Sequence, residues 1–188
     1  ILPASIKIEA QIESAMGLIS AAEIASHPQV ISLAFGPVDF MHSIAMPSSE
    51  PGIPGYSVSG ALQWPLLQIV IAAHAHGKLA YDGPFIKFSD EAGFIKSAEI
   101  SRALGADGKW VIHPSQIEVV NSIFSPTQKT FDSAAALLIF FEENQKNDSN
   151  ASGALLFEGK MVDMASQKMA EMIYAKGIAA GLEISSER

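Results

Sequence analysis

Acidic residues that follow apolar segments are the residues whose types and spacing could do chemistry in this sequence. Asp39 comes shortly after the apolar segment Val30–Phe35, and Glu13 directly follows Ile6–Ile12. In α/β folds, sites form at the carboxyl ends of parallel strands. Two carboxylates with little positive charge nearby suit Mg²⁺, which completes its shell with water and substrate oxygens. The same carboxylates could instead serve as general acid and base, or as helix caps.

Two further segments end in the same way. Leu79–Tyr81 runs into Asp82-Gly83-Pro84, and Lys109–Ile112 runs into His113-Pro114. If all four segments are neighbouring parallel strands, the three acids and the histidine converge at one edge of the sheet. We interpret His113 as a structural or substrate-contacting residue rather than a metal ligand, because no second histidine lies at ligand spacing.

The elements that must position these residues alternate between strand and helix. Val30–Phe35 is a nearly continuous apolar run with β-branched and aromatic residues, typical of a strand buried on both faces, and Gly36-Pro37 ends it. The other expected strands are Ile6–Ile12, Leu79–Tyr81 and Lys109–Ile112. The expected helices are Ala15–Ser26, Leu62–His76, one capped by Ser89 or Asp90 that ends at Leu104, Ser115–Phe124, and one that begins at Ser125-Pro126 and ends near Lys146. Such alternation predicts parallel strands with crossover helices.

The remaining segments differ in composition. Met41–Gly60 is a long loop dense in Pro, Gly and Ser, and loops of this length are usually functional or disordered. A polar linker, Asn147–Gly153, precedes a predicted hairpin made of Ala154–Phe157 and Lys160–Val162, with its turn at Glu158-Gly159. A last helix is expected from about Ala165 to Ala180.

Composition excludes several classes of function. The chain has 188 residues, of which 48% are hydrophobic, enough for one well-packed core. Its formal net charge of -8 argues against a nucleic-acid partner. The absence of cysteine excludes thiolate chemistry and suits a reducing compartment, so we expect the cytoplasm, or the mitochondrial matrix in a eukaryote. The longest apolar stretch, Leu66–Ala75, is too short to span a bilayer, so we expect no membrane partner.

Several separated segments together resemble one family. They are Gln11–Gly17, Phe35–Asp39, Asp82–Phe85 and Gly108–Gln116. Their order and spacing resemble the citrate lyase beta-subunit-like family of CoA-ester lyases, in particular malyl-CoA and citramalyl-CoA lyases. Glu158–Met164 resembles the carboxy-terminal segment of the same family.

The resemblance implies a (β/α)₈ TIM barrel and a Mg²⁺-dependent, aldolase-like lyase. Such an enzyme cleaves or forms a 3-hydroxyacyl-CoA, such as malyl-CoA or citramalyl-CoA, with acetyl-CoA and an α-oxo acid as the partners of the reaction. By the match, Glu13 and Asp39 are the metal-binding carboxylates. The backbone at Gly36-Pro37-Val38, through the amides that follow Gly36, would hold the oxo-acid carboxylate.

The resemblance also implies roles for the later motifs. Asp82-Gly83-Pro84 and His113-Pro114 would line the CoA channel. Asp163 matches an acid on a carboxy-terminal lid that reaches a neighbouring subunit in a trimer or hexamer. It would exchange a proton with the thioester methyl, and lid closure would raise its pKa by desolvation. The alternative for Asp163 is an ordinary exposed cap of the last helix.

The resemblance begins at the fifth of the family's eight strands, whereas a whole barrel needs roughly 250 residues. The family's early arginine and the basic residues that meet the CoA phosphates have no counterpart here. We therefore expect residues 1–146 to form the second half of a barrel with its terminal helix, and residues 147–188 to form a linker, hairpin and lid helix. Each edge strand would need a partner chain or the missing amino-terminal half. The chain alone would then be weakly active or inactive. The alternatives are an idle half-barrel that binds Mg²⁺, a CoA ester or a partner subunit, and an aldolase that acts on oxo acids without CoA.

Overall fold

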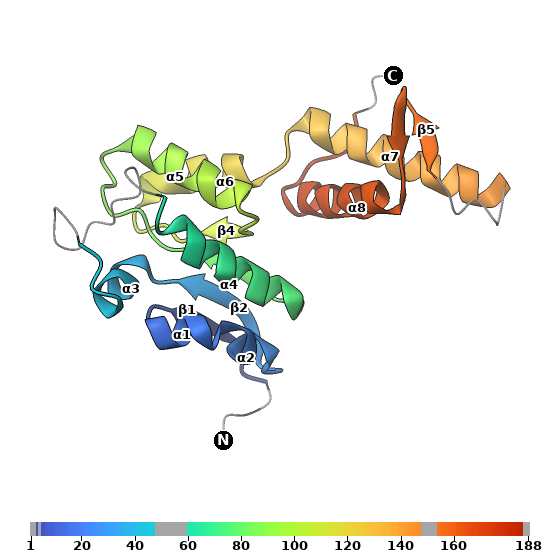
Figure 1. Cartoon of the computed structure of the whole chain (residues 1–188). Coiled ribbons are helices and arrows are strands. Elements are labelled where there is room, and N and C mark those ends of the chain that lie inside the picture. The colour runs from blue at the N-terminus through green and yellow to red at the C-terminus, as the bar shows by residue number, and fades with distance from the viewer. Residues whose placement is uncertain (1–2, 4, 48–59, 148–153, 186–188) are drawn as a thin grey trace. The chain divides into compact units, whose positions relative to one another are not determined.

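The computed structural model describes residues 3, 5–47, 60–147 and 154–185 (Figure 1). It divides the chain into two compact units, Ile1–Phe124 and Ser125–Arg188. The expected boundary at 146/147 differs from this division. The reason is that helix α7 (Gln128–Asn147) packs along helix α8 (Met164–Ala179), so it belongs with the second unit.

The first unit is built on a four-stranded parallel sheet. Its strands are β1 (Ile8–Ile12), β2 (Val30–Phe35), β3 (Leu79–Asp82) and β4 (Gly108–Lys109), in the order β1-β2-β3-β4. The prediction of a parallel α/β sheet is thus confirmed. β1 starts later than expected, and β4 has 2 residues rather than the four of Lys109–Ile112. The N–H of Ile112 donates to the Gln116 side chain instead of to β3, so the strand ends early.

The helices of the first unit largely follow the predicted pattern. They are α1 (Ala15–Ile19), α2 (Ala21–Ser26), α3 (Pro37–Ser43), α4 (Gln63–Ala75), α5 (Glu91–Ala103), the 3₁₀ helix η1 (Pro114–Gln116) and α6 (Ile117–Phe124). The single helix expected over 15–26 is wrong, because the chain breaks it at Ser20, with φ −91° and ψ 6°. Part of the expected loop Met41–Gly60 is the end of α3, and residues 48–59 lie outside the described residues.

The core lies on the face of the sheet that α2 and α4 cover. Leu33 and Phe35 of β2 are fully buried there with Ile69 of α4, each contributing about 1.5–3 kcal/mol through burial. Ser32 and Ala34, which point to the opposite face, are buried too. Burial of β2 on both faces is therefore confirmed, apart from the exposed Ile31 at its start.

The second unit consists of α7, α8 and a hairpin of β5 (Leu155–Phe157) and β6 (Lys160–Val162). The antiparallel hairpin turns at Glu158-Gly159, both with positive φ, as expected. Phe131 of α7 stacks on Tyr174 of α8 with ring centroids 5.1 Å apart. The helix start expected at Ser125-Pro126 is wrong, because α7 begins at Gln128 and the hydroxyl of Thr127 accepts the N–H of Thr130. Within the described part of the chain, no helix combines the length and apolar character needed to cross a membrane.

Candidate functional site

Glu13 and Asp39 lie at the same edge of the sheet. Glu13 follows β1, and the N–H of Gly36 donates to the carbonyl of Ile12 at 2.9 Å, which joins the ends of β1 and β2. A Cβ added to Gly36 would lie 2.6 Å from the Cβ of Glu13 and 3.1 Å from its Oε2. Glycine at position 36 therefore leaves the space that the Glu13 side chain occupies. Asp39 lies in the first turn of α3, whose N-cap is Gly36.

The side chains of these two acids have no protein partner among the described residues. Both residues are exposed, and among the described residues neither side chain makes a salt bridge or hydrogen bond. Two uncompensated carboxylates form the hard oxygen donor set that Mg²⁺ takes together with water and substrate oxygens. The described part of the chain has no group of three or more His, Asp or Glu side chains at metal-binding distance. A cation held by this pair would need the rest of its ligands from water or substrate, and the metal site stays a prediction.

Asp82, in contrast, is buried in a polar network. Its carboxylate accepts hydrogen bonds from Lys109 Nζ, from Ser101 Oγ and from the N–H of Gly83. Lys109 Nζ also donates to the carbonyl of Gly83 at 2.8 Å. The side chain of Asp82 thus stabilises the end of β3. The backbone of Gly83-Pro84 could still line the CoA channel, and that role stays a prediction.

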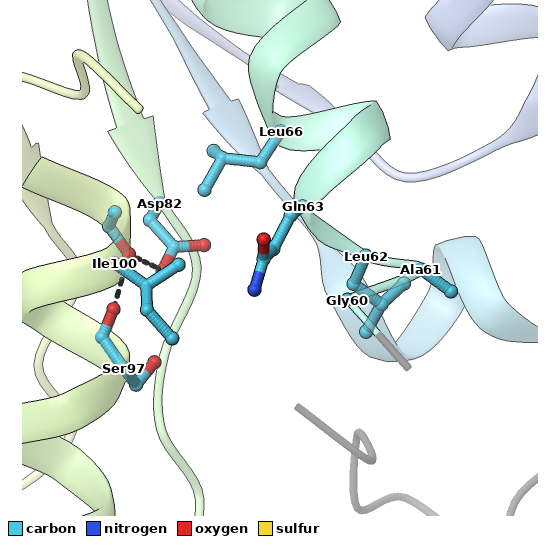
Figure 2. Close-up of a pocket in the computed structure, with 9 residues that line it drawn as sticks. Gly60, Ala61, Leu62, Gln63, Leu66, Asp82, Ser97 and Ile100 are labelled. Atoms are coloured by element: carbon cyan, nitrogen blue, oxygen red, sulfur yellow. Dashed lines mark hydrogen bonds between the residues drawn. The ribbon is translucent and has the colours of Figure 1, made fainter. Parts of the chain in front are cut away.

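A small cavity borders this network (Figure 2). Its volume of about 20 Å³ has room for roughly one water molecule. A pocket for a ligand is normally about 300–1,000 Å³, so this cavity is not a substrate pocket. It is lined by residues from the start of α4, the end of β3 and one side of α5: Gly60, Ala61, Leu62, Gln63, Leu66, Asp82, Ser97, Ile100 and Ser101.

The end of β3 also packs closely against the start of α3. A Cβ added to Gly83 would lie 2.3 Å from Cδ of Pro37 and 2.4 Å from the carbonyl oxygen of Phe35. Any side chain at position 83 would therefore displace the backbone that leads to Asp39. The end of β3 is therefore in contact with the end of β2, which is itself in contact with the end of β1.

His113 lies after β4, at the same edge as the acids. It is the N-cap of η1, where its Nδ1 accepts the N–H of Ser115, and its own N–H donates to Gln116 Oε1. Its ring stacks on Phe88 with centroids 4.9 Å apart. The structural role that we considered for His113 is present in these contacts. Pro114 is the first residue of η1, and a role for His113-Pro114 in binding CoA stays a prediction.

Two features of the sheet were missed by sequence reasoning. One is the Lys109–Asp82 pair, which a lysine at the start of an apolar strand could have signalled. The other is the carboxylate of Glu9, which accepts hydrogen bonds from Ser32 Oγ at 2.9 Å and Trp110 Nε1 at 3.1 Å. Burial raises the pKa of the nearby Tyr81 hydroxyl, and the negative charge of Glu9 adds to this shift. The partners of Glu9 lie 23 and 101 positions away, so no local pattern identifies them.

Asp163 belongs to the second unit and caps α8. Its Oδ1 accepts the N–H of Ser166 at 3.0 Å and the Ser166 hydroxyl at 3.1 Å. These hydrogen bonds lower the pKa of Asp163, and the one from the Ser166 N–H has the larger effect. In this conformation Asp163 is the exposed helix cap that we considered as an alternative. Its role as a catalytic acid or base stays a prediction.

With the fold and these contacts established, comparison with known proteins defines the class. Residues 2–114 match the model of the HpcH/HpaI aldolase/citrate lyase family, and the chain belongs to this family. The match contains both candidate metal-binding acids and the whole parallel sheet.

Within this family, the chain is similar to several proteins of known name. The chain is 36% identical over 181 residues to an L-malyl-CoA/beta-methylmalyl-CoA lyase of Cereibacter sphaeroides, covering 89% of this chain and 55% of the relative. It is 33% identical over 154 residues to a (3S)-malyl-CoA thioesterase of the same species, covering 82% and 50%. The structure of protein CitE from Mycobacterium tuberculosis in complex with magnesium, acetoacetate and coenzyme A has a TM-score of 0.72 and 28% identity, covering 95% of this chain and 62% of CitE. The chain thus spans about half the length of the curated relatives that it matches.

Proposed function

We propose that this protein is, or is part of, a Mg²⁺-dependent carbon–carbon lyase. The reaction is cleavage or formation of a 3-hydroxyacyl-CoA, such as malyl-CoA or citramalyl-CoA, with acetyl-CoA and an α-oxo acid as the smaller molecules. The observation that carries the proposal is the pair Glu13 and Asp39, which lies at one edge of the sheet and has no side-chain partner in the part of the chain that the structure describes. Relatives named as a malyl-CoA lyase and as a CitE bound to magnesium and coenzyme A support the choice of substrate and metal.

Different residues of the chain have different roles in this reaction. Glu13 and Asp39 hold the ion, which when bound supplies a Lewis acid for the oxo-acid carbonyl. The N–H groups that follow Gly36 bind the carboxylate of the oxo acid. The α3 helix begins there, and its first N–H groups have no partner within the helix. The backbone of Gly83-Pro84, held by the buried Asp82, and the motif His113-Pro114 lie at the same edge and line the path of the CoA ester.

Asp163 would move the proton. In the condensing direction it accepts a proton from the thioester methyl, and in cleavage it returns that proton to the enolate. The hydrogen bonds from Ser166 lower its pKa and make it a weak base in the conformation described. Its action therefore needs closure over the substrate, which removes water from the carboxylate and raises its pKa.

We further propose that the first unit corresponds to the last four strand–helix units of a (β/α)₈ barrel. The order of four parallel strands and the share of about half of each relative support this. Because β1 and β4 are the edge strands of the described sheet, the active assembly would pair this chain with the other half of the barrel, or with further subunits in a trimer or hexamer.

The test is incubation of the purified chain with malyl-CoA or citramalyl-CoA, with Mg²⁺ and with EDTA, followed by chromatography of the products. The proposal expects Mg²⁺-dependent release of acetyl-CoA and an oxo acid, at a low rate if part of the barrel is missing. Release of free CoA with a hydroxy acid would instead support a thioesterase, as one relative is named. Cleavage of a free hydroxy-oxo acid without CoA would indicate an aldolase. Binding of Mg²⁺ with no turnover of any substrate would indicate the idle binding module.

A further inference from the structure

We propose that Lys109 is a positioning residue for the metal-binding carboxylates, although it lies on β4, two strands away from β2. This inference rests on the proposed function, because it concerns the geometry of the Glu13 and Asp39 pair. Lys109 does not touch the ion or the substrate in this scheme. It acts through the packed ends of the strands between.

The first step is the hydrogen bond that Lys109 makes to the backbone of Gly83. The ammonium group of Lys109 is fully enclosed and donates both to Asp82 and to the carbonyl of Gly83. Asp82 in turn accepts the N–H of Gly83 at 2.8 Å. The buried ion pair therefore fixes both backbone polar groups of Gly83.

The second step is the contact of Gly83 with the chain that leads to Asp39. The missing side chain of Gly83 lets it lie directly against Pro37 and the carbonyl of Phe35, where even a methyl group would be 2.3 Å from the proline ring. Pro37 is the first residue of α3, and Asp39 lies in the same turn. Since protein interiors are close-packed, a shift of Gly83 is passed on to this turn.

The third step is the contact across to Glu13. Gly36, next to Pro37, lies against the Cβ and the carboxylate of Glu13. A displaced α3 therefore changes the separation of the two carboxylates. Mg²⁺ demands near-ideal octahedral geometry, so its affinity is sensitive to that separation.

The chemistry of the pair also favours a role in position over a role in stability. A buried ion pair often contributes no more to stability than apolar residues of similar volume would. Lys109 and Asp82 nevertheless occupy the interior at the end of β3, where Ser101 Oγ completes the hydrogen bonding of the carboxylate. Unlike apolar residues, the pair makes directional hydrogen bonds to the Gly83 backbone.

The experiment measures Mg²⁺ affinity by isothermal titration calorimetry for three variants of the full chain. Lys109→Met removes the hold on Gly83. The double variant Asp82→Asn with Lys109→Met removes it without leaving an unpaired buried charge, so we expect it to fold even if the single variant does not. Ser101→Ala is the matched control, because Ser101 donates to the same carboxylate but does not bind Gly83. All titrations are made below the unfolding temperature of each variant.

We expect both Lys109 variants to bind Mg²⁺ about 10–100-fold more weakly than the unsubstituted protein, the usual effect of a lost supporting interaction. Ser101→Ala should keep its affinity even if its unfolding temperature falls. Equal affinity in the double variant, or an equal loss in Ser101→Ala, would overturn this inference and leave the proposed function standing. A lack of Mg²⁺ binding by the unsubstituted protein would overturn the proposed function and this inference together.

Discussion

Asp39 and Asp82 both follow neighbouring strands, yet only Asp39 has an open carboxylate. Asp82 is the last residue of β3, and its carboxylate is enclosed by Ser101 of α5 and Lys109 of β4. Asp39 comes after Gly36-Pro37 and lies on the first turn of a helix instead. The sequence could predict the edge of the sheet for both acids. It could not predict the direction of each side chain, because the partner Lys109 lies 27 positions away from Asp82.

Removing either open carboxylate should abolish Mg²⁺ binding with little effect on the fold. In Glu13→Gln and Asp39→Asn the lost group has no partner among the described residues. The free energy of unfolding should therefore change by less than about 0.5 kcal/mol. Calorimetric titration with Mg²⁺ and urea denaturation measure the two effects. Glu23→Gln, another exposed acid of the first unit, is the control and should bind Mg²⁺ normally.

Substitution of Asp163 separates its two roles. Asparagine caps helices as well as aspartate does, so Asp163→Asn should keep α8 folded and keep Mg²⁺ and oxo-acid binding. It cannot exchange a proton, so turnover of the CoA ester should be lost. Unchanged turnover, measured as acetyl-CoA released, would remove Asp163 from the reaction and leave it as a cap alone.

The capping bonds of Asp163 also predict a pH dependence. Because its pKa is lowered from the usual 3.8, the charged form stabilises the folded state. This contribution is complete above pH 3.8 and is lost as the pH falls through the lowered pKa. Carbon NMR of the Asp163 carboxyl group should give a midpoint below 3.8, and Ser166→Ala should raise it. A midpoint at or above 3.8 in the unsubstituted protein would contradict the capping geometry.

At the scale of elements, the sequence predicted what local chemistry decides. Asp90, one of the two caps considered for its helix, caps α5 through its side chain. Ser14 likewise caps α1, and Gly77 and Gly105, which follow helices, have the positive φ that glycine adopts readily. The break at Ser20 was not predictable, because no proline or glycine marks it.

β4 shows the same limit. Its apolar residues predicted a strand of four, but the Gln116 side chain takes the N–H groups of Ile112 and His113. That competition depends on the turn into η1, which no pattern of apolar residues encodes.

The pairing of α7 with α8 offers a test of an element contact. Gly177 of α8 lies against Phe131, and an added Cβ would be 2.1 Å from the ring. Alanine normally favours a helix over glycine by about 1 kcal/mol. Overpacking at a stacked, fully buried ring costs about 1–3 kcal/mol, so Gly177→Ala should destabilise the second unit. Urea denaturation followed by far-UV circular dichroism measures this, and Phe131→Leu in the same chain should reduce the penalty.

At the scale of the whole molecule, the division after Phe124 gives each unit its own core. The sequence suggested a later boundary because the polar stretch from Asn147 looks like a linker. A polar composition predicts which segments are exposed to solvent. The boundary between the units depends instead on which helices pack together. The packing of α7 on α8 is a contact between distant segments and had no local signal.

Both tryptophans of the chain, Trp64 and Trp110, lie in the first unit. Tryptophan fluorescence therefore reports the unfolding of that unit alone. Leu33→Ala, at a fully buried position of β2, should lower its stability by about 2–5 kcal/mol. Gly177→Ala should leave the fluorescence transition in place and move only the circular dichroism signal of the other unit. If either substitution moved both transitions equally, the two units would unfold as one.

The hydrogen bond from Trp110 to Glu9 joins residues 101 positions apart. Loop-closure entropy must be overcome before contacts of such long range form, and parallel sheets are slow to fold for this reason. During synthesis, the ribosome must therefore release nearly the whole first unit before the polar side of β1 acquires its final partner. Until that moment the Glu9 carboxylate can have Ser32 as a partner but not Trp110, so the polar side of β1 is completed last.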